Sequence, residues 1–306
     1  GRTTAPTSEQ AAPGPPTPSS SATPPPRLAL DAGTEGDAGA APDVPAAGCA
    51  IEDRGLGSYR PWRRLDLGAV LIPETAATTS YDLLLHLHGA EAVRKVLAPA
   101  GLPIVIAALD AGRGSQAYEQ ALYGPTALEP LLASVHRAVT EAWGTSPERR
   151  HLVVSSWSAG YGGARQILRH HPSLPAAVIL LDSLHASYRA DGSGLESKGL
   201  EPFVALAERA QRGTARLVLT HSEIRPPDFA STAETASFLL RSVGAQRRYA
   251  GLRSVAGLEH KTEVEQGGLV VRGFTGTRRA DHCAHLGLLL PILRDDLLPA
   301  FAAAAD

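Results

Sequence analysis

Methionine is absent from this chain of 306 residues, and cysteine occurs only at Cys49 and Cys283. Lysine is nearly absent as well, at Lys95, Lys198 and Lys261, so almost every basic residue is arginine. Because the first residue is glycine and methionine is missing, we expect a processed or trimmed chain. The arginine bias and the abundance of alanine indicate a GC-rich, bacterial genome and say nothing about the fold.

A strong net charge and long apolar runs are also missing. The 29 basic and 31 acidic residues give a formal net charge of −2, which excludes a strongly basic nucleic-acid binder that acts through general electrostatics. No apolar run approaches the roughly 18 residues that a membrane-spanning helix needs. We therefore expect neither a nucleic-acid partner nor a transmembrane segment.

Residues 1–47 contain no aromatic residue, yet they hold ten of the 24 prolines. Proline, serine, threonine, alanine and glycine dominate this stretch, which cannot bury enough apolar surface to offset the entropy lost on ordering. We expect a disordered, partly polyproline spacer over 1–47. The spacer is either a tail without a role or a stalk that holds a domain away from a cell envelope. The stalk interpretation predicts an exported protein, whether periplasmic, envelope-tethered or secreted.

Residues 48–306 have the pattern of one α/β domain. Its strands are continuously apolar, which predicts that both faces of the sheet are covered. Since helical patterns separate the strands, we expect a doubly wound, mostly parallel sheet of about eight strands. The expected strands are 66–72, 81–89, 102–109, 151–157, 176–181, 215–220 and 267–274, with a hairpin from about residue 248 before the last one. The expected helices are 91–98, 126–143, 159–170, 201–212, 231–243 and 284–304, and capping boxes at Thr126/Glu129 and Ser231/Glu234 begin two of them.

The stretch SWSAG at 156–160 lies between an apolar strand and a helix. A nucleophile at Ser158 would occupy a tight turn, where the residues two before and two after must be small because strand and helix backbones nearly touch. Gly160 meets this demand; Ser156 stands where glycine is usual, and is still small. Gly162 and Gly163 would let the helix pack close to the sheet. The alternative is that Ser158 merely caps the helix.

A second pattern, LHLHGA at 85–90, ends the expected strand 81–89. A His-Gly pair at this point resembles the oxyanion-hole turn of α/β-hydrolases, the superfamily of serine esterases and lipases. Strand order, the SWSAG turn, the His-Gly turn and a late histidine extend the resemblance from about residue 65 to the C-terminus. It implies the α/β-hydrolase fold and an oxyanion held by the backbone N–H of Ala159 and of Gly89 or Ala90. For His86 itself, a buried histidine with its hydrogen bonds satisfied is the favoured interpretation.

The resemblance also implies a histidine base between the last strand and the final helix. The sequence DHCAH at 281–285 lies there, so the chain order of serine, acid and histidine is respected. His282 is expected in the loop, from which it can reach over the serine turn. His285, one turn into the helix, is the alternative and is expected to pack.

Two carboxylates compete for the role of the acid. Asp182 ends the strand after the serine strand, and Glu223 follows the next strand. Either can fix the imidazole tautomer and stabilise its cation. Asp182 can also be an ordinary strand-end residue and Glu223 a surface carboxylate, so the choice stays open.

The two cysteines leave a further alternative. In an exported protein Cys49 and Cys283 can pair, and the bridge would fix the start of the domain to the loop that carries the base. Otherwise they are two inert thiols.

Three function classes fit these residues. The first is a serine hydrolase that acts on an ester or related acyl bond through an acyl-enzyme. The second is a metal-dependent hydrolase using the donors His86, His88, Asp281, His282 and His285. The third is a non-catalytic binding module on the same fold. The segment 185–200 is short, polar and rich in glycine, which predicts an open site for a small-molecule or surface-presented acyl substrate. No Gly-rich phosphate loop follows the first strand, so no cofactor is expected.

Overall fold

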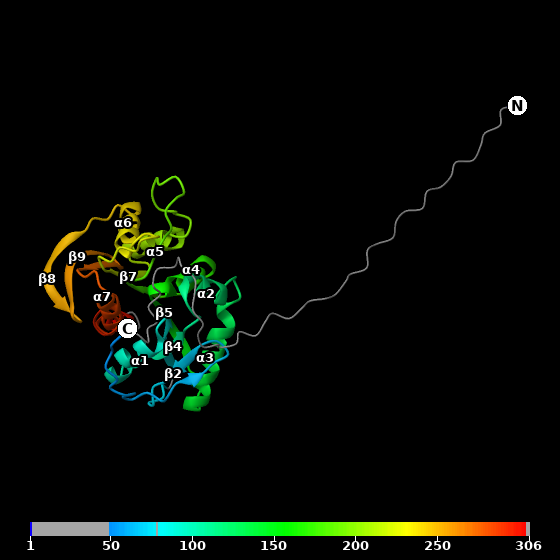
Figure 1. Cartoon of the computed structure of the whole chain (residues 1–306). Coiled ribbons are helices and arrows are strands. Elements are labelled where there is room, and N and C mark those ends of the chain that lie inside the picture. The colour runs from blue at the N-terminus through cyan, green and yellow to red at the C-terminus, as the bar shows by residue number, and fades with distance from the viewer. Residues whose placement is uncertain (2–48, 78, 304–306) are drawn as a thin grey trace, which may run out of the picture. The chain divides into compact units, whose positions relative to one another are not determined.

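The structure, a computed structural model, describes Gly1, residues 49–77 and residues 79–303. The chain divides into two units, Gly1–Ala38 and Gly39–Asp306. Every element named below belongs to the second unit, which Figure 1 shows in colour. Apart from Gly1, the expected spacer over 1–47 lies outside the described residues.

A single mixed sheet organises the second unit. Its strands are β1 (Arg63–Arg64), β2 (Ala69–Leu71), β3 (Ser80–Leu87), β4 (Val105–Leu109), β5 (Glu148–Trp157), β6 (Ala177–Leu181), β7 (Arg216–His221), β8 (Arg248–Val255), β9 (Leu258–Gln266) and β10 (Leu269–Phe274). They lie in the order β1-β2-β4-β3-β5-β6-β7-β10-β9-β8. The six central strands, from β4 to β10, are parallel, and the two strands at each edge are antiparallel. The sheet is therefore mostly parallel, as expected.

Within the described residues the sheet has ten strands, so the expectation of about eight was too low. The edge strand β1 consists of Arg63 and Arg64, both exposed, and an exposed two-residue strand carries no apolar signal. The long hairpin β8–β9 also contributes two full strands, which curl away from the edge of the sheet in Figure 1.

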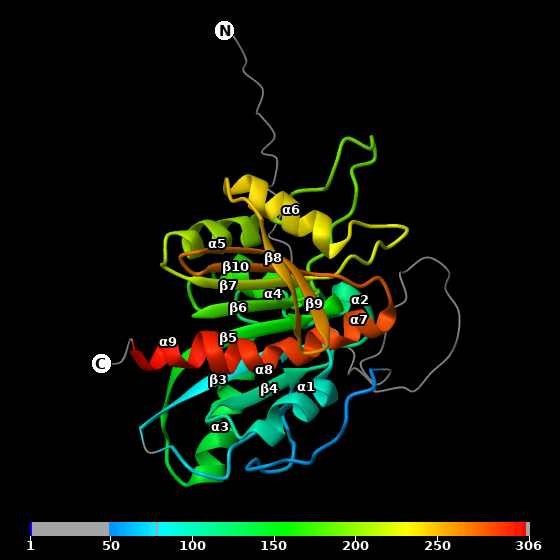
Figure 2. The ribbon, with the colours of Figure 1, turned by 90° about the vertical axis from the view of Figure 1, so that its left-hand side faces the viewer.

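Helices cover both faces of the sheet. They are α1 (Ala90–Leu97), α2 (Gly114–Ala121), α3 (Leu128–Trp143), α4 (Tyr161–His170), α5 (Glu201–Gln211), α6 (Thr232–Ser242), α7 (Arg279–Ala284), α8 (Leu289–Pro291) and α9 (Leu298–Ala303). Side chains of α2 to α6 pack in one apolar cluster, and those of α1 and the C-terminal helices pack in a second. Along β3, Leu83 and Leu85 belong to the first cluster and Leu84 to the second, as the alternation of a strand requires. Figure 2 looks onto the face that α1 and the C-terminal helices cover.

One of the two predicted capping boxes is present. At the start of α6, Ser231 Oγ accepts from the backbone N–H of Glu234 (3.2 Å), and a carboxylate oxygen of Glu234 accepts from the N–H of Ser231 (2.9 Å). The box at Thr126 and Glu129 was wrong, since α3 begins at Leu128 without a side-chain cap. A separate turn precedes α3, in which the Ala127 N–H donates to the carbonyl of Gly124 (3.4 Å), so the helix begins two residues later than expected.

The C-terminal helix was expected over 284–304 as one continuous element. Instead α7 begins at Arg279, and a 3₁₀ turn (His285–Leu288) and a π turn (Ile292–Leu297) interrupt the path to Ala303. The early start follows from Asp281, whose carboxylate accepts from the backbone N–H of Arg278 (2.9 Å) and so caps the first turn. The expectation that His282 lies in a loop was therefore wrong, because it lies within α7.

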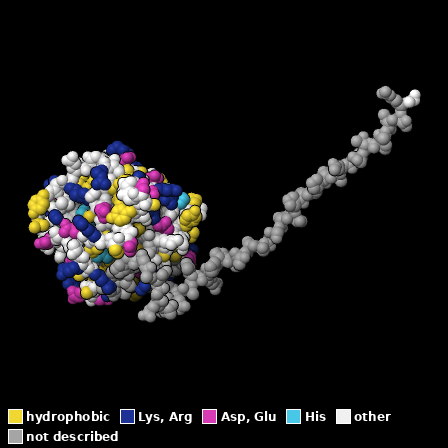
Figure 3. Space-filling model, turned by 45° about the horizontal axis from the view of Figure 1, so that its top comes forward, with side chains coloured by type: hydrophobic (Ala, Val, Ile, Leu, Met, Phe, Trp, Pro, Cys, Tyr) yellow, Lys and Arg dark blue, Asp and Glu magenta, His cyan; other side chains and the backbone are white. Residues whose placement is uncertain are grey.

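The surface of the second unit carries both signs of charge. In Figure 3 basic and acidic side chains are interspersed over the face shown. Among the described residues, no helix has both the length and the apolar composition needed to cross a bilayer.

Candidate active site

Ser158 follows β5 directly and begins the 3₁₀ turn that leads into α4. Its backbone φ is 49°, in the left-handed region that non-glycine residues rarely adopt. A Cβ on Gly160 would lie 2.1 Å from the carbonyl oxygen of Leu87, so only glycine allows the turn to approach the end of β3. A Cβ on Gly162 would lie 2.2 Å from the carbonyl oxygen of Ser115. Gly162 therefore lets α4 approach α2, rather than the sheet as expected.

The buried Ser156 has a clear role in this turn. Its Oγ lies 2.9 Å from the Oγ of Ser183, and Ser183 Oγ donates to the carbonyl oxygen of Ser158 (2.8 Å). Since the Ser183 proton goes to that carbonyl, Ser156 is the donor in the first contact. These two hydrogen bonds connect the serine turn to the loop after β6. A glycine at position 156 would have no hydroxyl to donate the first of them.

Asp182 lies at the carboxyl end of β6, next to the serine strand, and is almost completely buried. Its Oδ2 accepts from His282 Nδ1 at 2.7 Å. Its Oδ1 accepts from the backbone N–H of Ser222 (2.8 Å) and from Thr232 Oγ1 (2.5 Å). Burial alone would raise the pKa of this carboxyl, but the neighbouring His285 and His282 and the hydrogen bond from Thr232 hold it well below its usual range.

Glu223, the other candidate acid, lies elsewhere. Its carboxylate pairs with Lys261 Nζ at 2.6 Å, and its side chain is 40% exposed. Its backbone N–H donates to the carbonyl of Gly276 (3.0 Å), which ties the loop after β7 to the segment before α7. The structure thus brings Asp182, and not Glu223, to the predicted base.

The two candidate histidines have different surroundings. The His282 side chain is 13% exposed and faces the Asp182 carboxylate. His285 is fully buried, contacts Thr220 Oγ1 through Nδ1 (2.8 Å) and packs edge-on against Phe274. Burial lowers the pKa of His285 to about 4. His285 is thus the packed histidine, as expected, although both histidines lie in helical turns.

The predicted oxyanion donors divide into two groups. Ala159 follows Ser158 in the turn and is buried. The backbone N–H groups of Gly89 and Ala90 both donate to the carboxylate of Asp110, at 2.6 and 3.1 Å. Asp110 follows β4 and so places a negative charge at the N-terminus of α1, where the helix dipole favours it. In the structure these two N–H groups serve that cap, a use that the sequence pattern did not reveal.

The histidine pair at 86 and 88 makes polar contacts within the fold. His86 is fully buried, its Nδ1 lies 2.7 Å from Ser155 Oγ, and its Nε2 donates to the carbonyl of His88 (2.7 Å). Burial lowers the pKa of His86 to about 4. His88 Nδ1 lies 2.6 Å from the hydroxyl of Tyr118. No group of three or more histidine, cysteine, aspartate or glutamate side chains able to hold a metal ion occurs among the described residues.

Cys49 and Cys283 form a disulfide, with their Cα atoms 5.4 Å apart. The bridge attaches the residue next to His282 to the segment that precedes β1. That segment is itself anchored on α1, because Asp53 pairs with the buried guanidinium of Arg94. Of the two alternatives that the sequence left open, the structure has the bridge.

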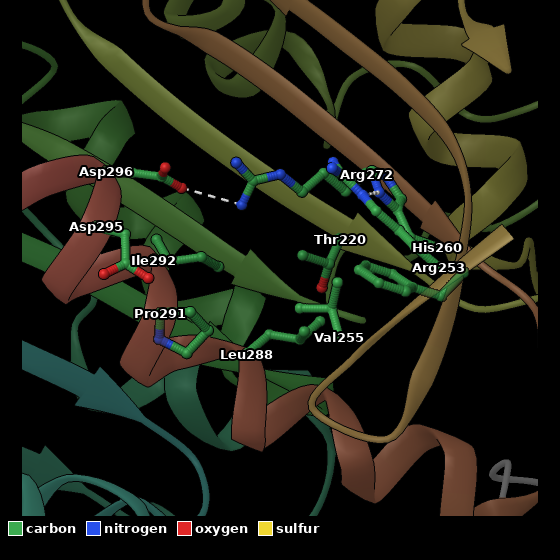
Figure 4. A pocket seen from close by; sticks show the side chains of 11 residues that line it. Thr220, Arg253, Val255, His260, Arg272, Leu288, Pro291, Ile292, Asp295 and Asp296 are labelled. Atoms are coloured by element: carbon green, nitrogen blue, oxygen red, sulfur yellow. Dashed lines mark hydrogen bonds and ion pairs between the residues drawn. The ribbon is translucent and has the colours of Figure 1, made fainter. Parts of the chain in front are cut away.

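Two hollows lie near these residues, and neither is lined by Ser158, Asp182 or His282. A cavity of about 170 Å³ separates β9 and β10 from the C-terminal helices, and Arg272 and Asp296 pair within it at 2.9 Å (Figure 4). A polar hollow of about 320 Å³ is lined in part by Arg278 and Asp281, before and within α7. The described segment between β6 and α5 contains no helix and holds only isolated bridges, one of them between Tyr188 and Leu195.

No family model matches the sequence, and no curated protein matches it either. Solved structures do resemble the fold. The enterochelin esterase of Shigella flexneri superposes with a TM-score of 0.51 at 16% identity, over 84% of this chain and 62% of that one. The enterobactin esterase of the same organism, in the presence of 2,3-dihydroxy-N-benzoyl-serine, gives the same score and identity over 84% and 63%. An IroE-like serine hydrolase from Shewanella oneidensis follows at 0.45, with 14% identity over 76% and 78%.

The chain has the α/β-hydrolase fold. It spans about 62% of the length of the Shigella enterochelin esterase that it resembles. Within this fold, Ser158, Asp182 and His282 follow one another along the chain in the order that α/β-hydrolases use for nucleophile, acid and base. Ser158 and Asp182 stand at the carboxyl ends of the adjacent strands β5 and β6, and α7 brings His282 to Asp182.

Proposed function

We propose that this chain is a serine hydrolase that cleaves an ester or a related acyl bond through an acyl-enzyme. The observation that carries the proposal is the 2.7 Å hydrogen bond from His282 Nδ1 to the buried Asp182, which adjoins the strained turn at Ser158. Charge-assisted bonds of this kind orient an imidazole and stabilise its cation.

The reaction we propose follows from the tautomer that this bond selects. Because Nδ1 carries the proton donated to Asp182, Nε2 of His282 has a free lone pair. Nε2 takes the proton of Ser158 Oγ as that oxygen bonds to the acyl carbon, and then gives it to the leaving alcohol as the ester C–O bond breaks. A water molecule, deprotonated by Nε2 in the same way, then releases the acid and restores Ser158.

The backbone N–H of Ala159 is the oxyanion donor that we propose for both tetrahedral intermediates. One such donor contributes about 3–4 kcal/mol to lowering the barrier. Gly89 or Ala90 as the second donor stays a prediction, and it requires that one of their N–H groups leave Asp110.

The substrate that we propose is a small-molecule or surface-presented ester. The likeness to esterases supports ester hydrolysis as the reaction class, and the absence of a helical lid in the described segment after β6 supports an open site. We further propose that the domain works outside the cytosol, as an exported protein. The disulfide supports this location, since such bonds persist in oxidising compartments.

Hydrolysis of p-nitrophenyl acetate and butyrate by the purified chain tests the proposal. We expect turnover by the wild-type chain and a loss of about 10³-fold or more in kcat for Ser158→Ala. The matched control is Ser193→Ala, an exposed serine in the segment after β6, which should keep wild-type activity. Equal activity of the wild-type chain and Ser158→Ala would contradict the proposal, and no turnover by a folded wild-type chain would favour the non-catalytic module.

A further inference from the structure

Trp157, the residue before Ser158, contacts the predicted base directly. Its ring stacks on the imidazole of His282, with centroids 4.7 Å apart and planes at 30°. Its indole Nε1–H donates to the backbone carbonyl of His282 at 3.0 Å. Trp157 is fully buried, and the His282 side chain is 13% exposed. One side chain thus holds the ring and the backbone of the same histidine.

A second group supports the indole. The ring of His88 stacks on Trp157 with centroids 5.2 Å apart and planes at 12°. The ring of His88 in turn meets Tyr118 edge-on and contacts its hydroxyl at 2.6 Å. His88 has a φ of 77°, an uncommon conformation for a non-glycine residue that is kept only when the surroundings fix it. The indole is therefore held from the ends of β3 and β5 together.

We propose that Trp157 is a positioning residue that fixes His282 toward Asp182 and stabilises the imidazolium formed when His282 takes the serine proton. The inference rests on the proposed function, since it assigns Trp157 a part in the same proton transfer. The electron-rich face of an indole attracts a cation that lies within about 6 Å of the ring centroid, and tryptophan is the best aromatic residue for this. The stacking distance to His282 lies within that range.

Two other titratable groups interact with His282: the Asp182 carboxylate after β6, which accepts from Nδ1, and His285 in the following 3₁₀ turn. Asp281 and Arg278 are its charged neighbours at the start of α7, and His88 also stacks on the indole. A substitution of Trp157 leaves all of them in the chain. If a Trp157 variant keeps the fold and the titration of His282 changes, the change is therefore due to the loss of the indole.

The test uses three variants of the full chain. Trp157→Leu removes the aromatic face and the N–H donor, and Trp157→Phe keeps a ring without the donor. The matched control is Trp143→Phe, because Trp143 Nε1 also donates to a backbone carbonyl, that of Pro73 at 2.9 Å, on the other face of the sheet. The readouts are the thermal midpoint, kcat and KM, and the titration of the His282 imidazole followed by NMR, with His282→Gln assigning its resonance.

We expect Trp157→Leu to lower kcat by about 3–30-fold with KM nearly unchanged, since the lost contact acts in proton transfer and not in substrate binding. The midpoint of the His282 titration should fall by about 0.5–1 pH unit in Trp157→Leu and by less in Trp157→Phe. Trp143→Phe should lower only the thermal midpoint.

The inference is overturned if a folded Trp157→Leu keeps the wild-type titration midpoint, because the indole is then only a core residue. If Trp157→Leu does not fold, the same comparison is made between Trp157→Phe and Trp143→Phe, and equal midpoints overturn it. The NMR titration needs no turnover. A shifted midpoint in a chain that hydrolyses no ester would therefore refute the proposed function and leave the contact intact.

Discussion

Replacing Asp182 by asparagine separates the acid's part in catalysis from its part in the fold. The carboxylate accepts three hydrogen bonds: Oδ1 accepts from Ser222 and Thr232, and Oδ2 accepts from His282. In Asp182→Asn the amide oxygen can keep the first two. The amide NH₂ then faces Nδ1 of His282 and can only donate, so Nδ1 must be unprotonated to accept this hydrogen bond. Nε2 then carries the proton and cannot accept one from Ser158.

The size of the effect follows from that change of tautomer. The matching substitution in a serine protease triad lowers kcat by about 10⁴-fold, which is about 5.5 kcal/mol in the activation free energy. We expect the same order for Asp182→Asn. The cost in unfolding free energy should be smaller, about 1–3 kcal/mol, because only the charge assistance to the retained bonds is lost.

Glu223→Gln is the matched control, since it makes the same change of carboxylate to amide at the competing acid. Glu223 pairs with Lys261 at a half-exposed position, and such pairs contribute about 0–1 kcal/mol. We expect kcat within about twofold of wild type, as for a surface substitution. Steady-state hydrolysis of p-nitrophenyl butyrate and thermal unfolding of both variants give the comparison. Comparable losses of kcat in the two variants, or near-wild-type turnover by Asp182→Asn, would refute the assignment of the acid.

Two further predictions concern stability. Changing Cys49 and Cys283 to alanine removes a bridge between residues 234 apart, and the entropy of loop closure predicts a loss of up to about 5 kcal/mol in the free energy of unfolding. We also expect kcat to fall, because α7 loses its covalent attachment beside the base. Denaturant unfolding and turnover should give the same values for the variant and for the reduced wild-type chain, and values equal to those of the oxidised wild-type chain would show that the bridge is dispensable. The unfolding free energy should also fall as the pH falls from 6.5 to 4. The pKa values of the buried His86, His221 and His285 are lowered to about 4, chiefly by burial, so in this window the unfolded chain binds protons that the folded chain does not. Each histidine contributes about 1.4 kcal/mol per pH unit to the change in unfolding free energy, and His285→Gln should remove one such contribution. An unfolding free energy that does not change with pH in the wild-type chain would contradict the assignment of these histidines as buried and neutral.

The central strands and the serine turn could be predicted from the sequence because their signals are local. The apolar runs that became β3 and β5 are continuous, and SWSAG places small residues on either side of Ser158. The helix α2 was missed because only Tyr118 is buried along it, so its apolar face is too weak to produce a helical period.

The choice of acid could not be made from the sequence, because it depends on which strand end α7 approaches. Asp182 and Glu223 both follow parallel strands, and only the path of Arg278 to Ala284 across the edge of the sheet decides between them. The contacts of Trp157 were missed for a similar reason. They join residues 125 positions apart, and no local pattern in the sequence records such a pairing.

Covalent labelling by a fluorophosphonate probe, with mass spectrometry to locate the adduct, tests most directly whether Ser158 is an activated nucleophile. The reaction needs a serine whose proton is taken by a neighbouring base, so it does not depend on knowing the substrate. We predict one adduct per chain, on Ser158, with labelling abolished in Ser158→Ala and strongly slowed in Asp182→Asn. A folded wild-type chain that stays unlabelled, or an adduct on another serine, would contradict the account.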